Sequence, residues 1–94
     1  MTAINTNFNF TVKVNDIHYG GEFFYQNVEI ELASLRFKST HCAIEQVSYF
    51  RNIAGRWTCW DVQLNRPKTE TDQTLYTLFT EVYGLSLLQA DLYS

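Results

Sequence analysis

Aromatic side chains constrain this sequence most: seven phenylalanines, six tyrosines and two tryptophans make up 16% of its 94 residues. The densest stretch, residues 56–64, has the composition of a β-strand and places Trp57 and Trp60 on opposite faces. A sheet with a single covering layer buries only one face, so we expect Trp57 to point away from the main core. Large solvent-facing rings on a small protein usually mark a contact surface.

Length and composition predict a single globular domain spanning residues 1–94. With four glycines and one proline, most of the chain is expected to lie in regular elements. The formal charge of -3 and the absence of a basic stripe make nucleic acid an unlikely partner. A mildly acidic surface suits a protein partner with a basic groove.

The beginning of the chain lacks the pattern of a signal peptide, and no apolar run approaches the ~20 residues of a membrane span. These features predict a cytoplasmic protein without a membrane partner. In that compartment Cys42 and Cys59 are expected to be reduced thiols.

The first two predicted strands are read from alternation. Residues 8–14 alternate strictly between apolar and polar side chains. Asn15 and Asp16 are predicted to begin a turn, and Gly20 and Gly21 to supply the backbone freedom for chain reversal. The second strand, residues 22–32, has an apolar face that comprises Phe24, Val28, Ile30 and Leu32. Its other face, aromatic at one end and acidic at the other, comprises Phe23, Tyr25, Glu29 and Glu31. A short third strand is predicted over residues 35–38.

Residues 39–55 admit two interpretations. Apolar residues at helical spacing, with Ser39 or Thr40 as a cap, would make a helix. The β-branched and aromatic side chains of residues 47–50 instead favour a strand that pairs with residues 57–64 across a turn. We favour the hairpin.

The strongest helical pattern covers about residues 70–83, where Gly84 is predicted to end or bend the helix, and a short terminal helix could follow. The expected fold is α+β: an antiparallel sheet of four to five strands with this C-terminal helix on one face. The expected core is Phe8, Phe10, Val12, Val14, Val28, Ile30, Trp60, Val62, Leu64, Leu75, Leu78, Phe79 and Val82.

No motif for catalysis, a cofactor or a metal emerges. The metal-capable side chains His18, His41, Cys42 and Cys59 lack the close ligand spacing of zinc sites. Cys59 could serve as a nucleophile beside a histidine and Asp61, but packing explains a lone cysteine equally well. We therefore expect neither a metal nor a cofactor, and a protein that is not an enzyme.

The remaining hypothesis is a contact surface for another protein. Its predicted residues combine the aromatic, arginine and acidic side chains of interfaces, and are Phe23, Tyr25, Glu29, Glu31, Arg56 and Trp57. The alternative is that a second layer of the same chain, residues 86–93 or 39–55, covers these rings internally. The sequence thus favours a small binding module that docks on a larger complex and inhibits or adapts it. Compact acidic domains of this kind occur among phage and mobile-element accessory proteins, including inhibitors of host defence systems.

Two other functions stay open as alternatives. The same rings could stack the bases of a single-stranded nucleic acid, or Cys59 could support a small cysteine-dependent enzyme. Self-association into a homodimer through an exposed sheet edge is a further hypothesis.

Overall fold

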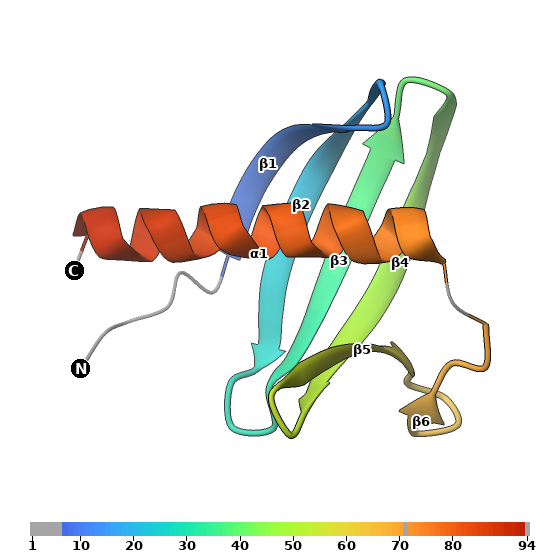
Figure 1. Cartoon of the computed structure of the whole chain (residues 1–94), viewed down its shortest axis with the longest axis vertical. Helices are drawn as coiled ribbons and strands as arrows, with labels where there is room; N and C mark the ends of the chain where they lie inside the picture. The colour runs from blue at the N-terminus through green and yellow to red at the C-terminus, as the bar shows by residue number, and fades with distance from the viewer. Residues whose placement is uncertain (1–6, 71, 94) are drawn as a thin grey trace.

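The computed structural model describes residues 7–70 and 72–93, and residues 88–93 by their backbone alone. It shows an antiparallel sheet in which each strand pairs with its neighbours in sequence, followed by one helix (Figure 1). The elements are β1 (Asn7–Val14), β2 (Ile17–Asn27), β3 (Leu32–Ser39), β4 (Cys42–Ile53), β5 (Arg56–Asp61), β6 (Arg66–Pro67) and α1 (Gln73–Tyr93). The predicted α+β class and antiparallel sheet are confirmed, but the sheet has six strands and not four to five.

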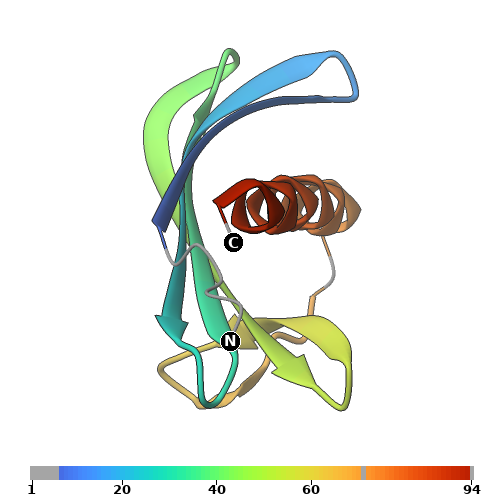
Figure 2. The same ribbon diagram turned by 90° about the vertical axis from the view of Figure 1, so that its left-hand side faces the viewer.

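The sheet curls around α1, which runs across its concave face (Figure 2). Alternation in β1 turns Phe8, Phe10 and Val14 inward, where all three are buried. On the helix, Leu78 and Val82 are buried against the same face, in accordance with their helical spacing. The core therefore lies between one helix and one side of the sheet.

Helix α1 begins at a side-chain cap and continues without a break past Gly84. The Asp72 Oδ1 atom accepts a hydrogen bond from the Leu75 N–H at 3.1 Å, which satisfies a free donor of the first turn. The prediction of a separate terminal helix is wrong, because Ser86 does not cap a new helix. Its hydroxyl donates to the Tyr83 carbonyl at 2.7 Å inside α1, and the residue is fully buried.

An aromatic cluster joins α1 to the sheet. Phe79 stacks on Phe50 with ring centroids 4.1 Å apart, and its centroid lies 5.2 Å from that of Trp57. Phe23 and Tyr83 pack against the same ring at 6.0 and 5.9 Å. Offset and edge-on ring pairs contribute about 0.5–1.5 kcal/mol each beyond the burial of their area. Phe79 is therefore the ring through which helix and sheet are held together.

The hairpin interpretation of residues 39–55 is correct. β4 and β5 pair across a tight turn at Ala54 and Gly55, both of which have positive φ angles, 53° and 86°. The alternative helix over this stretch is not formed, because the backbone of β4 is extended and pairs with β3 on one side and β5 on the other.

Part of the expected core is wrong. β2 ends at Asn27, so Val28 and Ile30 lie in a turn and are 50% and 45% exposed. Val62 and Leu64 similarly follow the end of β5 and are 43% and 60% exposed. In both places the alternation continues in the sequence after the strand has stopped, and it therefore no longer reports burial.

The glycine pair also has a different role from the one predicted. The β1–β2 turn is made by Asn15 and Asp16, with φ angles of 50° and 64°, as in a type I′ hairpin. Gly20 and Gly21 lie inside β2, between β1 and β3. A Cβ atom on Gly21 would collide with the carbonyl oxygen of Arg36 and lie 2.7 Å from the Phe37 Cα. Close approach of β3, and not chain reversal, requires this glycine.

The two glycines therefore differ in their tolerance of a side chain. Gly21→Ala is expected to lower the free energy of unfolding by about 1–3 kcal/mol, because β2 and β3 must separate to admit the methyl group. Gly20→Ala is the matched control: its Cβ would lie 3.6 Å from the Phe10 carbonyl oxygen, an ordinary contact. Urea titrations of both variants measure the difference, and equal losses would contradict the close approach.

Tyr25 makes stability depend on alkaline pH. Burial, together with the hydrogen bond that its hydroxyl donates to the Tyr83 hydroxyl at 3.3 Å, raises its pKa well above 10. The unfolded chain ionises this phenol first, so the free energy of unfolding should fall as pH rises past about 10. The decline between about pH 9 and pH 11 should be shallower in Tyr25→Phe. Denaturant titrations across this range check it, and identical slopes in both proteins would contradict it.

Candidate protein-docking surface

The structure separates the six predicted contact residues into a buried and an exposed group. Phe23 and Tyr25 are 0% and 7% exposed and lie under α1. Trp57 faces the same side, half-buried against Phe79 and Tyr83. The expected exposed aromatic face is therefore wrong at this side of the sheet, because α1 covers it. A base-stacking platform of the same three rings loses its surface for the same reason.

Glu29, Glu31 and Arg56 are exposed, and their role in binding stays a prediction. They belong to one end of the molecule, which we call the loop end. It consists of the β2–β3 turn (residues 28–31), the β4–β5 turn (54–55) and the β5–β6 turn (62–65), all opposite the β1–β2 and β3–β4 turns (Figure 1).

The β2–β3 turn is held by a side chain at the end of β2. The Asn27 Oδ1 atom accepts hydrogen bonds from the N–H groups of Glu29 and Ile30, at 3.0 and 3.3 Å. The turn closes with Glu31 in the left-handed region, at a φ of 48°. A side-chain acceptor that mimics a backbone turn fixes this conformation locally.

The β5–β6 turn repeats this arrangement. The Asp61 Oδ1 atom accepts hydrogen bonds from the N–H groups of Gln63 and Leu64, both at 3.1 Å, and Asn65 closes the turn at a φ of 53°. The two sequences, Asn-Val-Glu-Ile-Glu at 27–31 and Asp-Val-Gln-Leu-Asn at 61–65, match in residue type at every position but the last. This repeat can be read from the sequence. The alternation of apolar and polar residues around it, however, led to the wrong prediction that its four aliphatic residues belong to the core.

Each of these twin turns presents two aliphatic side chains to solvent. Val28 and Ile30 are exposed on the first turn, and Val62 and Leu64 on the second. Ile53, beside the β4–β5 turn, is also 43% exposed. Five of the eight exposed large aliphatic residues of the described chain therefore lie at or beside the loop end.

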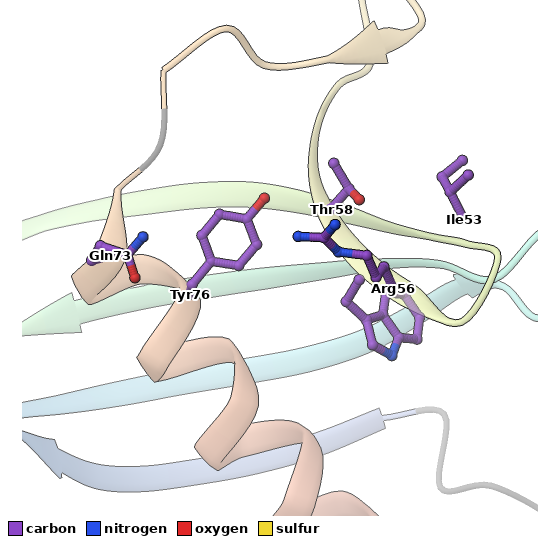
Figure 3. A pocket seen from close by; sticks show the side chains of 6 residues that line it. Ile53, Arg56, Thr58, Gln73 and Tyr76 are labelled. Atoms are coloured by element: carbon purple, nitrogen blue, oxygen red, sulfur yellow. The ribbon is translucent and has the colours of Figure 1, made fainter.

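Arg56 and Trp57 also line an open pocket of about 600 Å³ between the start of α1 and β5 (Figure 3). The Tyr76 hydroxyl accepts a hydrogen bond from the Cys59 N–H at 2.7 Å, so its own proton is free to be donated. The pocket is lined by Ile53, Arg56, Trp57, Thr58, Gln73 and Tyr76. The lining of the pocket thus combines one cationic side chain and several hydrogen-bonding groups with apolar side chains, and the pocket lies next to the loop end.

The convex face of the sheet carries a second set of rings. Register places Phe24, Tyr49 and Trp60 in one row across the strands, on the side away from α1. Trp60 is 7% exposed, as its predicted burial requires, but it lies outside the helix-covered core. The Arg51 guanidinium sits 5.0 Å from its ring centroid, within cation–π range.

The environments of Cys59 and of the metal-capable side chains bear on the two chemical hypotheses. Cys59 is 5% exposed in the core, and burial raises the pKa of its thiol. Such a thiol is mostly protonated near neutral pH and is a poor nucleophile. Among the side chains that the structure describes, in residues 7–70 and 72–87, no three His, Cys, Asp or Glu gather closely enough to hold a metal ion.

Comparison with protein families, with curated proteins and with solved structures finds no match to this chain. Within the part of the chain that the structure describes, no helix combines the length and apolarity needed to cross a bilayer.

The two thiols should differ in reactivity. Cys42 lies half-buried at the start of β4, whereas Cys59 is enclosed, so iodoacetamide at about pH 8 should label Cys42 first and leave Cys59 largely unmodified. Peptide mass spectrometry quantifies both sites, with the denatured chain as the control in which both react. Faster labelling of Cys59 in the folded protein would contradict its burial.

Proposed function

We propose that this protein is a non-enzymatic binding domain that docks on a larger protein assembly through its loop end. The observation that carries the proposal is the pair of twin turns, each pinned by an Asx side chain and each presenting two exposed aliphatic residues. The proposal keeps the protein-binding function expected from the sequence but moves the contact from the sheet face to the turns.

The stiffness of the turns supports this function. Association loses affinity when loops must be ordered on binding, and a turn already fixed by its own hydrogen bonds avoids much of that cost. Burying an aliphatic side chain stabilises a complex by about 1.5–3 kcal/mol when the whole side chain leaves water. With about half of each side chain exposed, one turn would contribute roughly 1–3 kcal/mol.

The surroundings of the turns fit a protein interface with an apolar centre and a polar rim. Glu29 and Glu31 lie within the first turn, and Arg66 follows the second. The partner that fits is a protein surface with apolar depressions bordered by charges of both signs. Occupying such a surface would block or bridge it, which is how a domain of this kind would inhibit or adapt a complex.

Paired substitutions in the turns test the proposal. Val28→Ser with Ile30→Ser, and separately Val62→Ser with Leu64→Ser, should each weaken binding about tenfold or more, since each removes apolar contact but retains the Asx hydrogen bonds. Proteins captured from source-cell lysate by wild type but lost by both variants would be purified, and their affinities measured by calorimetry.

Ile44→Ser is the matched control. Ile44 is the most exposed of these aliphatic residues, at 76%, but it lies near the start of β4, away from the loop end. It should bind like wild type, and circular dichroism should show all three variants folded. A purified partner that binds both turn variants as tightly as wild type would refute docking through the loop end.

A further inference from the structure

The first strand, β1, is an edge of the sheet that no described residue pairs with on its outer side. All eight of its residues pair in unbroken register with β2, so the strand is regular along its length. The Thr40 N–H donates to the His18 carbonyl at 3.0 Å. The even-numbered residues of β2 therefore point their main-chain N–H and C=O groups towards β3. By antiparallel alternation, Asn7, Asn9, Thr11 and Lys13 of β1 turn both N–H and C=O out of the sheet.

The other unpaired stretches of the sheet have features that discourage pairing with another strand, and β1 has none of them. β6, at the opposite edge, is two residues long and ends in Pro67, which has no N–H to donate. β5 leaves the first part of β4 unpaired, but the β3–β4 register shifts there, between Phe37 and Ser39. β1 has no bulge or proline, and Lys13 is its only charged residue.

Helix α1 also extends beyond this edge. Its C-terminal turns project past β1 on the side where the sheet ends, and Figure 2, viewed from that side, shows the helix end nearest the viewer. The sequence of these turns, Leu-Ser-Leu-Leu-Gln-Ala-Asp-Leu-Tyr over residues 85–93, is largely apolar. Of the inward side chains of β1, Val12 is only half-buried. A further strand beside β1 would lie under these turns.

We propose that the missing strand is β1 of a second copy, so that two chains form a symmetric dimer with one continuous sheet. A two-fold axis perpendicular to the sheet at Phe10 pairs Asn7 with Lys13 of the other copy and Asn9 with Thr11. This register engages all four outward residues of both strands and keeps inward side chains facing inward. Shifting the axis by one residue either way leaves an outward residue, Asn7 or Lys13, without a partner in β1 of the other copy.

The register is also compatible with the charges. Each Lys13 faces an uncharged Asn7, so no like charges stand opposite each other on the outer face. Among the described residues of its own chain, Lys13 pairs with the Asp16 carboxylate, 3.6 Å away. On the inner face Phe8 stands opposite Val12 of the other copy. In Figure 1, α1 crosses near the start of β1 and its last turns extend past that edge, so in the dimer they would extend towards that valine.

The dimer is independent of the docking proposal. The β1 edges pair antiparallel, so the two loop ends would face opposite directions and both stay free. Such a dimer could engage two copies of a partner at once.

Sedimentation velocity of the purified full chain tests the dimer without any partner. A concentration-dependent dimer is expected, and a protein that stays monomeric at on the order of 100 µM overturns the proposal. Thr11→Pro removes an N–H that points out of the sheet and spares the β1–β2 hydrogen bonds, so it should yield a folded monomer. Thr11→Ala is the matched control and should dimerise like wild type.

Substitutions at Asn7 test the register without relying on proline. Asn7→Lys would place a second ammonium group opposite Lys13 of the other copy, and Asn7→Glu would place a carboxylate there. The dimer dissociation constants of these two variants should differ by about threefold or more, with Asn7→Glu the tighter. Equal constants, or a dimer that survives Thr11→Pro with its fold intact, would show that the copies do not meet through β1 in this way.

Discussion

The packing of one helix into the hollow of a curled sheet is the interaction on which the rest of this structure depends. Phe79 lies between Phe50 and Trp57 and joins elements that are far apart in the sequence. Each large ring removes roughly 150–250 Å² from water when it is buried, so a few rings supply much of the core of a chain this short. The aromatic richness of the sequence is explained first by this internal requirement.

Because the rings are buried under the helix, the contacts that we propose with other molecules use features that a count of aromatic residues does not reveal. The Asx hydrogen bonds at Asn27 and Asp61 place aliphatic side chains on stiff turns. The regular backbone of β1 supplies a row of free donors and acceptors at an edge. Both features involve main-chain hydrogen-bonding groups. Those of the turns are satisfied within the chain, and those on the outer side of β1 pair with no described residue.

Much of the fold could be predicted from local patterns, because those patterns were not interrupted. The alternation of residues 8–14 predicted β1, and the spacing of Leu75, Leu78, Phe79 and Val82 predicted the helix-covered side of the core. The prediction of which side chains face the core was wrong where a strand ended earlier than the alternation in the sequence. Val28 and Ile30 continue the parity of Phe24, but the turn held by Asn27 separates them from it. Of the candidate site, Glu29, Glu31 and Arg56 are exposed, and their role in binding stays a prediction.

The sequence by itself determined the α+β class, the antiparallel sheet and the C-terminal helix, since propensity and periodicity act over a few neighbouring residues. Only the tertiary structure decided which face of the sheet α1 covers, and therefore that Phe23 and Tyr25 are buried and Trp57 half-buried. Both faces of β2 carry a phenylalanine, Phe24 on one and Phe23 on the other. Phe23 is fully buried because it packs against Phe79, and this contact with a helix some fifty residues later is not specified by the strand's own residues.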